Sequence, residues 1–211
     1  MKNLIKIPLI KIGKEREMYC GPIVLSSILN YFGKEKNYKE LAKEFGGDVS
    51  KGSSPFALTY VALKEGLNVD YLSEFKHFSN NNSRFSDNLK AFWKMVDMEK
   101  VQEKYLGLIS TKRKFIFIKK RPEIADLKRY LDEKKPIILG LNANELGYEE
   151  QSNFPTHYVL VTGYDEKNIF FHTTWPKNLE YEKLSFNSFE RAWSSNGWTK
   201  DIIIPYLNKS K

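Results

Sequence analysis

Two residues that lie far apart in the chain could together perform thiol chemistry. Cys20, the only cysteine, begins an apolar segment, and His157 begins a run of apolar residues in the C-terminal third. A thiol at a helix N-terminus feels the positive end of the helix dipole, which favours the reactive thiolate. An imidazole beside it would complete a thiolate–imidazolium pair, which makes a cysteine nucleophilic. We therefore predict that Cys20 is a nucleophile and His157 its base.

Two predicted helices frame the cysteine. Apolar residues recur every three or four positions over 20–32, and Gly33 follows, which predicts a helix that begins at the cysteine. Ser54 and Pro55 form a typical N-cap and first turn of another helix, which Gly66 ends.

The histidine belongs to a predicted pair of strands. The apolar runs over 157–164 and 168–173 are separated by a short polar turn, which predicts two neighbouring buried strands. Helices come first and most strands later, so we predict an α+β fold in which N-terminal helices pack on a C-terminal antiparallel β-sheet. Further strands are predicted near 67–72, 106–110, 114–119, 136–141 and 202–204, further helices over 38–45, 87–105 and 185–193, and an extended arm or edge strand over 4–12.

Length and composition limit the classes of protein that this chain can be. Its 211 residues fit one domain, 1–211, with a sizeable core. One cysteine excludes an internal disulfide, and no apolar stretch is long enough for a signal peptide or a membrane span, so we expect a cytoplasmic protein with no membrane partner. The net charge is +8, but the one dense basic run, Lys112–Arg121, flanks a predicted strand, so we do not expect nucleic-acid binding.

The order of these parts resembles a known family. Cys20-Gly21-Pro22 opens the apolar helix, and His157-Tyr158-Val159-Leu160-Val161-Thr162-Gly163-Tyr164-Asp165 follows in the C-terminal third. This arrangement resembles the papain-like cysteine peptidases and is most similar to the double-glycine leader (bacteriocin-processing) peptidases and their free-standing relatives. The resemblance implies a papain-like fold and spans the chain except for about 74–121, which we interpret as an insertion that borders the active-site cleft.

Two positions depart from the family pattern. The family's oxyanion glutamine, six residues before the cysteine, is replaced by Lys14, which becomes the candidate oxyanion donor. The family's Asp or Asn, about sixteen residues after the histidine, is replaced by Thr173. A threonine hydroxyl can orient the imidazole but cannot stabilise its protonated form as a carboxylate does.

The resemblance implies a thiol-dependent peptidase or amide hydrolase that acts on a peptide or amide substrate through Cys20, His157 and Thr173. Two alternatives stay open: an acyltransferase on the same scaffold, and a catalytically inactive relative that serves as a binding module. Cys20, His157 and His172 match no metal-ligand spacing, so we expect neither a metal nor a cofactor. The sequence does not determine the oligomeric state.

Overall fold

The computed structural model describes residues 4–11, 19–45, 53–74, 107, 109, 114–148, 156–196 and 200–208. Lys14, the predicted helix over 87–105 and most of the predicted insertion at 74–121 lie outside these residues. The helices are α1 (Cys20–Tyr31), α2 (Tyr38–Glu44), α3 (Pro55–Lys64), η2 (Ala143–Glu145), α6 (Ile124–Asp132) and α7 (Phe186–Ser194). The strands are β1 (Asn68–Ser73), β2 (Phe115–Lys119), β3 (Ile137–Asn142), β4 (Thr156–Tyr164), β5 (Asn168–Thr173), β6 (Leu179–Ser185) and β7 (Ile202–Tyr206).

All strands in the described part of the chain belong to one seven-stranded sheet with the order β2-β1-β7-β3-β4-β5-β6. Neighbouring strands are antiparallel, except that β1 and β2 run parallel. The predicted α+β class, with N-terminal helices on a sheet built mostly from the C-terminal half, is confirmed. The sheet also takes up β1 and β2 at one end, so it is mixed and not purely antiparallel.

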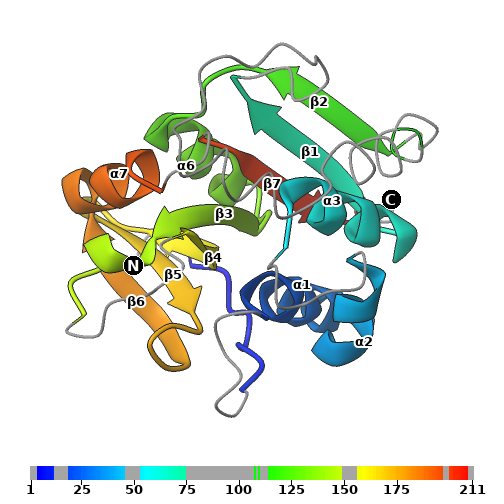
Figure 1. Cartoon of the computed structure of the whole chain (residues 1–211). Helices are drawn as coiled ribbons and strands as arrows, with labels where there is room; N and C mark the ends of the chain where they lie inside the picture. Colours follow the sequence, from blue (N-terminus) through cyan, green and yellow to red (C-terminus); the bar gives the residue numbers. More distant parts are fainter. Residues whose placement is uncertain are drawn as a thin grey trace, which may run out of the picture.

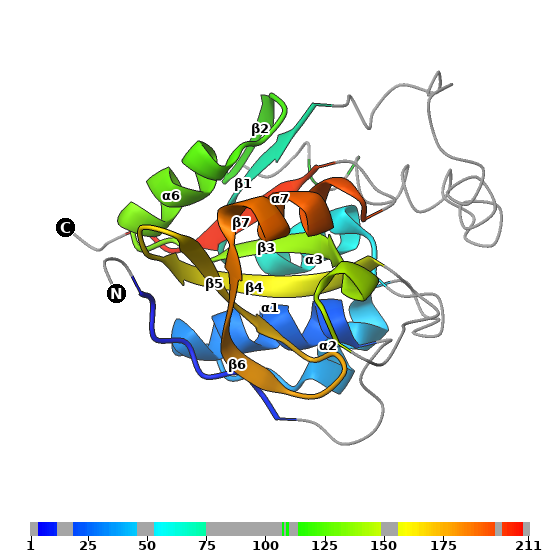
Figure 2. The same ribbon diagram turned by 90° about the vertical axis from the view of Figure 1, so that its left-hand side faces the viewer.

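The helices cover both faces of this sheet (Figure 1). Helices α1, α2 and α3 lie on one side, and α6 and α7 on the other, as the side view in Figure 2 shows clearly. The strand β4, which carries the histidine, lies between α1 on one face and α6 on the other. The two sides therefore bury β4 almost along its whole length, which explains its uninterrupted apolar sequence.

Helix α1 is buried far beyond one stripe. Every residue from Cys20 to Leu29 is buried, because α2, α3 and β4 surround the helix. Gly33 ends the helical turn with a φ of +73°, a left-handed conformation that favours glycine. Helix α3 begins as the sequence predicts: the Ser54 hydroxyl caps it by accepting a hydrogen bond from the Ala57 N–H at 3.1 Å.

The N-terminal residues form the predicted extended arm, which runs beside α1 (Figure 2). The Ile5 N–H donates to the carbonyl of Thr162 at 2.7 Å, and the Ile10 N–H donates to the hydroxyl of Ser27 in α1 at 3.1 Å. The arm therefore ties the start of the chain to both the central strand and the cysteine helix.

Two local features differ from the sequence-based expectation. Residues 107 and 109, within a predicted strand, are helical. The strand β6 was not predicted, because its sequence, Leu179 to Ser185, is rich in Glu and Lys and its side chains are only partly buried. An edge strand with charged side chains lacks the apolar signal of the inner strands.

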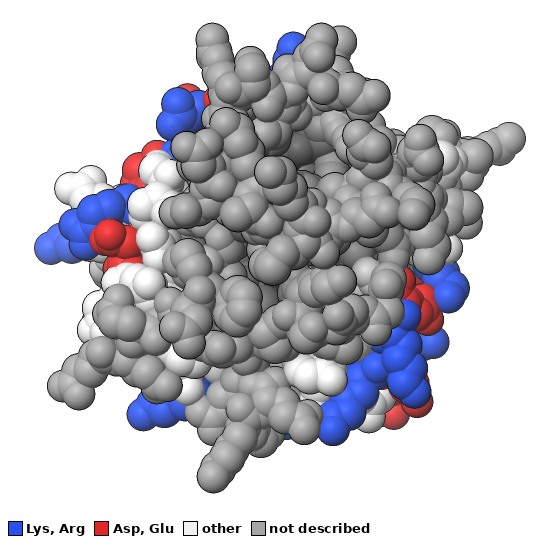
Figure 3. Space-filling model, in the orientation of Figure 1, with Lys and Arg blue, Asp and Glu red and all other residues white. Residues whose placement is uncertain are grey.

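No helix in the described residues is long and apolar enough to cross a membrane. On the face drawn in Figure 3, the described Lys and Arg side chains lie among Asp and Glu side chains and do not form one continuous basic surface.

Candidate active site

Cys20 is the first residue of α1 and is buried, with 5% of its surface exposed. Tyr19 precedes it without providing a side-chain cap, and the first turn contains no acidic residue. The positive end of the α1 dipole is therefore not offset by a carboxylate in its own first turn. A helix N-terminus of this kind stabilises a thiolate, whereas burial of the side chain disfavours any charged form.

His157 is the second residue of β4 and is 3% exposed. Burial lowers its pKa from 6.5 to about 3, because a charged imidazolium loses its hydration inside the protein. The imidazole is therefore neutral at physiological pH. A neutral ring can accept a proton as a base.

The hydroxyl that contacts this imidazole belongs to Thr174. Its Oγ1 lies 3.2 Å from His157 Nε2. The hydroxyl of Thr173, the residue that the sixteen-residue offset selects, instead donates to the Trp175 carbonyl at 3.0 Å and accepts from the Trp175 N–H at 3.1 Å. The hydrogen-bonding position predicted for Thr173 is thus taken by its neighbour.

The reason for this displacement lies in the strand pairing. The β4–β5 ladder contains a bulge between Val161 and Gly163 and ends at the pair Leu160 and His172. Thr173 pairs with Leu179 of β6 after a register shift that follows Phe171, and Thr174 comes after the end of β5. Strict alternation of side chains no longer decides there which of the two faces the histidine.

Electrostatics place Cys20 close to the start of β4. The pKa of Tyr158, which is buried directly after His157, is raised well above its usual value by burial, then by the charge of Asp201, and then by that of Cys20. Successive residues of a strand point to opposite faces, so Tyr158 and His157 extend from β4 in different directions. Helix α1, which begins at Cys20, packs on β4, so the two candidate residues lie on contacting elements.

A close backbone approach holds the start of α1 against the residues that precede α3. A Cβ at Gly21 would lie 2.7 Å from both Cβ and Oγ of Ser53, which is too close for any real contact. Only glycine therefore allows α1 to approach Ser53 in this way. This contact brings Cys20 near Pro55, the first residue of α3.

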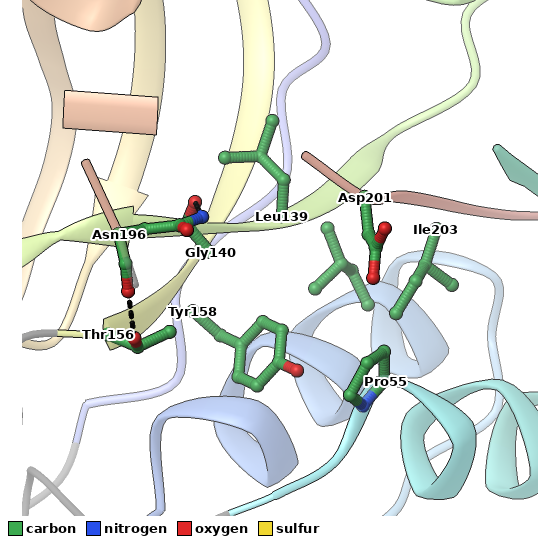
Figure 4. Close-up of a pocket in the computed structure, with 9 residues that line it drawn as sticks. Pro55, Leu139, Gly140, Thr156, Tyr158, Asn196, Asp201 and Ile203 are labelled. Atoms are coloured by element: carbon green, nitrogen blue, oxygen red, sulfur yellow. Dashed lines mark hydrogen bonds between the residues drawn. The ribbon is translucent and has the colours of Figure 1, made fainter. Parts of the chain in front are cut away.

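A small pocket lies between β3, β4, the start of β7 and the start of α3 (Figure 4). Its walls include Pro55, Gly140, Tyr158, Asp201 and Ile203, and its interior is about the size of one water molecule. The ring of Tyr158 and the carboxylate of Asp201 both point into the space beside Pro55 (Figure 4). Two of the elements that line the pocket, α3 and β4, also pack against α1.

Sequence reasoning missed three residues of this region: Tyr158, Thr174 and Asp201. The first two are sequence neighbours of predicted site residues, but the sequence does not show which way their side chains point. Asp201 precedes a predicted strand and carried no signal, because its neighbours here come from remote parts of the chain.

The remaining candidate residues lie elsewhere. Lys14 is outside the described residues. His172 is buried on β5, where its Nδ1 accepts from the Tyr181 N–H at 2.9 Å and its Nε2 lies 2.7 Å from the Ile7 carbonyl. It anchors the N-terminal arm. Within the described parts of the chain, no three His, Cys, Asp or Glu side chains come together as metal ligands would.

This architecture, in which N-terminal helices pack on a mixed seven-stranded sheet, is that of the papain-like peptidases. The chain belongs to the Peptidase_C39-like family, whose model matches residues 5–200. No curated protein matches the chain.

Three solved structures share the fold. A putative C39-like peptidase from Bacillus anthracis is 16% identical, with a TM-score of 0.61 and all of both chains covered. The peptidase domain of Streptococcus ComA, a bifunctional ABC transporter of a quorum-sensing pathway, is 15% identical, with a TM-score of 0.56 over 96% of this chain and 100% of that domain. A double-glycine-motif protease from an AMS/PCAT transporter, solved with its leader peptide, is 15% identical, with a TM-score of 0.53 over 99% of this chain and 96% of the other.

Proposed function

We propose that this protein is a thiol-dependent peptidase or amide hydrolase, in which Cys20 is the nucleophile and His157 the base. The observation that carries the proposal is the hydrogen bond between His157 Nε2 and Thr174 Oγ1, on the strand against which α1 packs. Family membership supports a peptide substrate. The positioning residue is Thr174, in place of the predicted Thr173.

The hydrogen bond suggests how the imidazole would act. In the neutral tautomer that carries its proton on Nε2, this N–H donates to Thr174 Oγ1, and Nδ1 keeps the lone pair that a base needs. Nδ1 of His157 then takes the thiol proton while the sulfur of Cys20 bonds to the substrate carbonyl carbon. The carbonyl electrons move to oxygen and form a tetrahedral oxyanion.

Collapse of the oxyanion breaks the C–N bond, and His157 returns its proton to the leaving amine. Water then attacks the thioester, gives a proton to His157, and releases the acid as the C–S bond breaks and the thiol re-forms. The backbone N–H of Cys20 and one side-chain donor would stabilise the oxyanion, and one such donor lowers the barrier by roughly 3–4 kcal/mol. Lys14 is the proposed side-chain donor. An amine in place of water would make the same site an acyltransferase.

One observation favours the inactive binding module as a second candidate. Burial holds the pKa of His157 at about 3, and its partner Thr174 is neutral. Neither the surroundings of the ring nor this partner stabilises the protonated imidazole. Unless substrate or an additional charged group stabilises the imidazolium, proton transfer from the thiol is uphill.

The test combines alkylation of Cys20 with peptide hydrolysis. The intact protein is treated with iodoacetamide, and the mass shift is followed with time; a peptide mixture is then incubated with the protein, and new termini are identified by mass spectrometry. Cleavage that His157→Gln and Cys20→Ala both abolish supports the hydrolase. The inactive binding module is supported if Cys20 is labelled slowly, at the same rate as in His157→Gln, and if no peptide is cleaved. A product joined to an added amine would show acyl transfer.

A further inference from the structure

The N-terminal arm, residues 4–11, lies against the rest of the protein as an extended segment. Ile5, Ile7 and Leu9 are at most 4% exposed, whereas the residues between them are exposed. This alternation resembles that of a strand, but the arm is not one of the strands of the seven-stranded sheet. Its attachment therefore depends on these three side chains and on a few hydrogen bonds, one of which involves a histidine.

His172, on β5, uses both of its ring nitrogens in this attachment. The residue is completely buried; its Nδ1 accepts from the Tyr181 N–H at 2.9 Å, and its Nε2 lies 2.7 Å from the Ile7 carbonyl. A backbone N–H can only donate and a carbonyl can only accept, so Nδ1 carries the lone pair and Nε2 carries the proton. A neutral imidazole in this tautomer satisfies both contacts. The closed arm thus requires an uncharged ring.

A proton on Nδ1 would place two hydrogen-bond donors against each other. The new N–H would face the Tyr181 N–H, which would lose its acceptor inside the protein. The negative charge of Glu180 favours the imidazolium, but the Oε1 of this carboxylate already accepts from the Leu9 N–H of the arm at 2.6 Å. If the carboxylate turned toward the ring, it would release the arm at Leu9.

The other groups around the ring supply no second negative charge. The phenol ring of Tyr181 packs edge-on against the imidazole, with the ring centroids 4.4 Å apart, and Leu160, the partner of the histidine on β4, is apolar. The charged residues of the arm, Lys6 and Lys11, are basic and exposed. A protonated ring would therefore depend on Glu180 for its counter-charge.

We propose that the N-terminal arm is an acid-sensitive strap, which His172 holds closed while its ring is neutral and releases when the ring takes up a proton. In the closed arm burial lowers the pKa of the histidine, with the Ile7 carbonyl and Glu180 acting in the opposite direction. In the open arm water reaches the ring, and its pKa returns to about 6.5. Opening therefore becomes more frequent as the pH falls below about 6.5, by at most about tenfold per pH unit.

An open arm also changes the surroundings of the cysteine helix. The hydrogen bond from the Ile10 N–H to the Ser27 hydroxyl joins the arm to α1, and opening breaks it. The apolar surface that Ile5, Ile7 and Leu9 cover becomes accessible at the same time. Acid thus loosens the start of the chain from α1 while the sheet stays folded.

Amide hydrogen exchange of the full-length protein, followed by NMR from pH 7 to pH 5 and corrected for the intrinsic exchange rate, measures this opening. The amides of Ile5, Leu9 and Tyr181 report the strap, and those of β3 report global unfolding. The strap amides should be less protected than those of β3 at every pH, because they open locally. Their protection should fall by up to about tenfold per pH unit below about pH 6.5, while the ring resonances of His172 show protonation.

Two variants test the role of the histidine. His172→Gln offers an acceptor and a donor that do not titrate, so the protection of the strap amides should no longer depend on pH, whereas His157→Gln, the matched control, should leave that dependence unchanged. In Glu180→Gln the amide oxygen can still accept from the Leu9 N–H, but the charge that favours the closed imidazolium is gone. The loss of protection between pH 7 and pH 5 should therefore become larger.

Three results would overturn the proposal. The first is strap protection that does not change with pH, and the second is protection equal to that of β3, which would mean that the arm opens only when the whole protein unfolds. The third is a pH dependence that His172→Gln retains or, if that variant does not fold, one that Glu180→Gln leaves unchanged or reduces. The experiment needs no reactive thiol, so its outcome is independent of the proposed hydrolase function.

Discussion

The Oγ1 of Thr174 lies 3.2 Å from Nε2 of His157 and gives the buried imidazole a neutral hydrogen-bond partner. A hydroxyl fixes the direction and the tautomer of the ring but adds no negative charge to favour its protonated form. The structure therefore separates two tasks that an aspartate would perform together. In the mechanism proposed above, Thr174 would orient the ring, and the thiolate or the substrate would have to stabilise its charge.

The first prediction concerns the two neighbouring threonines. Thr174→Val removes the hydroxyl from His157 and should lower kcat/KM for peptide hydrolysis about threefold to tenfold, since one neutral hydrogen bond contributes roughly 0.5–1.5 kcal/mol. Thr174→Ser should restore it. Steady-state kinetics with the three proteins is the measurement.

Thr173→Val is the matched control for that experiment. It leaves the polar groups of the Trp175 backbone without their side-chain partner and should lower the free energy of unfolding by about 1–3 kcal/mol. Its effect on kcat/KM should be smaller than that of Thr174→Val. The reverse ranking in kcat/KM would return the positioning role to Thr173.

The second prediction concerns the pH dependence of Cys20 labelling. The neutral His157, with a pKa of about 3, cannot hold the thiolate as an ion pair at neutral pH. The rate of alkylation should therefore rise between pH 6 and pH 9, as it does for ordinary thiols, and should not be flat.

Thr174→Asp tests the cause of that pH dependence. A carboxylate beside Nε2 favours the imidazolium, so this variant should label faster near pH 7 and with a shallower pH profile. A flat profile in the unmodified protein would contradict the assignment of His157 as neutral.

The third prediction concerns stability in acid. Burial lowers the pKa values of both His157, to about 3, and His172, so the unfolded chain binds more protons than the folded one below about pH 6.5. Stability is therefore complete above pH 6.5 and falls as the pH drops through this range, by up to about 1.4 kcal/mol per pH unit for each histidine.

Urea denaturation at pH 7, 6, 5 and 4 measures this effect. His157→Gln and His172→Gln should each reduce the slope of the unfolding free energy against pH, whatever they do to its value at pH 7. If neither variant changes the slope, the acid sensitivity arises from carboxylates instead.

The fourth prediction concerns the approach of α1 to the start of α3. Gly21→Ala places a Cβ 2.7 Å from Cβ and Oγ of Ser53, so one of the two segments has to move. We expect a loss of about 1–3 kcal/mol in unfolding free energy and slower alkylation of the adjacent Cys20. The double variant Gly21→Ala with Ser53→Gly removes both atoms that the new Cβ would meet, and it should recover part of each loss.

Several elements could be predicted because short stretches of sequence specify them. The helix that begins at Cys20 ends before Gly33, whose φ is positive. Ser54 caps α3 by accepting a hydrogen bond from the N–H of Ala57, three residues later. The strand that begins near His157 is apolar throughout because both of its faces are covered. In each case the interactions that decide the structure join residues less than five positions apart or follow from burial alone.

The arrangement of the site depended on contacts between remote segments. Thr174 and not Thr173 meets His157 because the pairing of β5 with both of its neighbours is irregular near these residues, so counting along the strand no longer gives direction. The pKa of Tyr158 is raised by burial and by the charges of Asp201 and Cys20, which come from opposite ends of the chain. The sequence alone thus determined the residue types and the local elements. Only tertiary packing decided which polar groups face each other and how dry their surroundings are, because burial and long-range pairing set both the pKa of His157 and its hydrogen-bond partner.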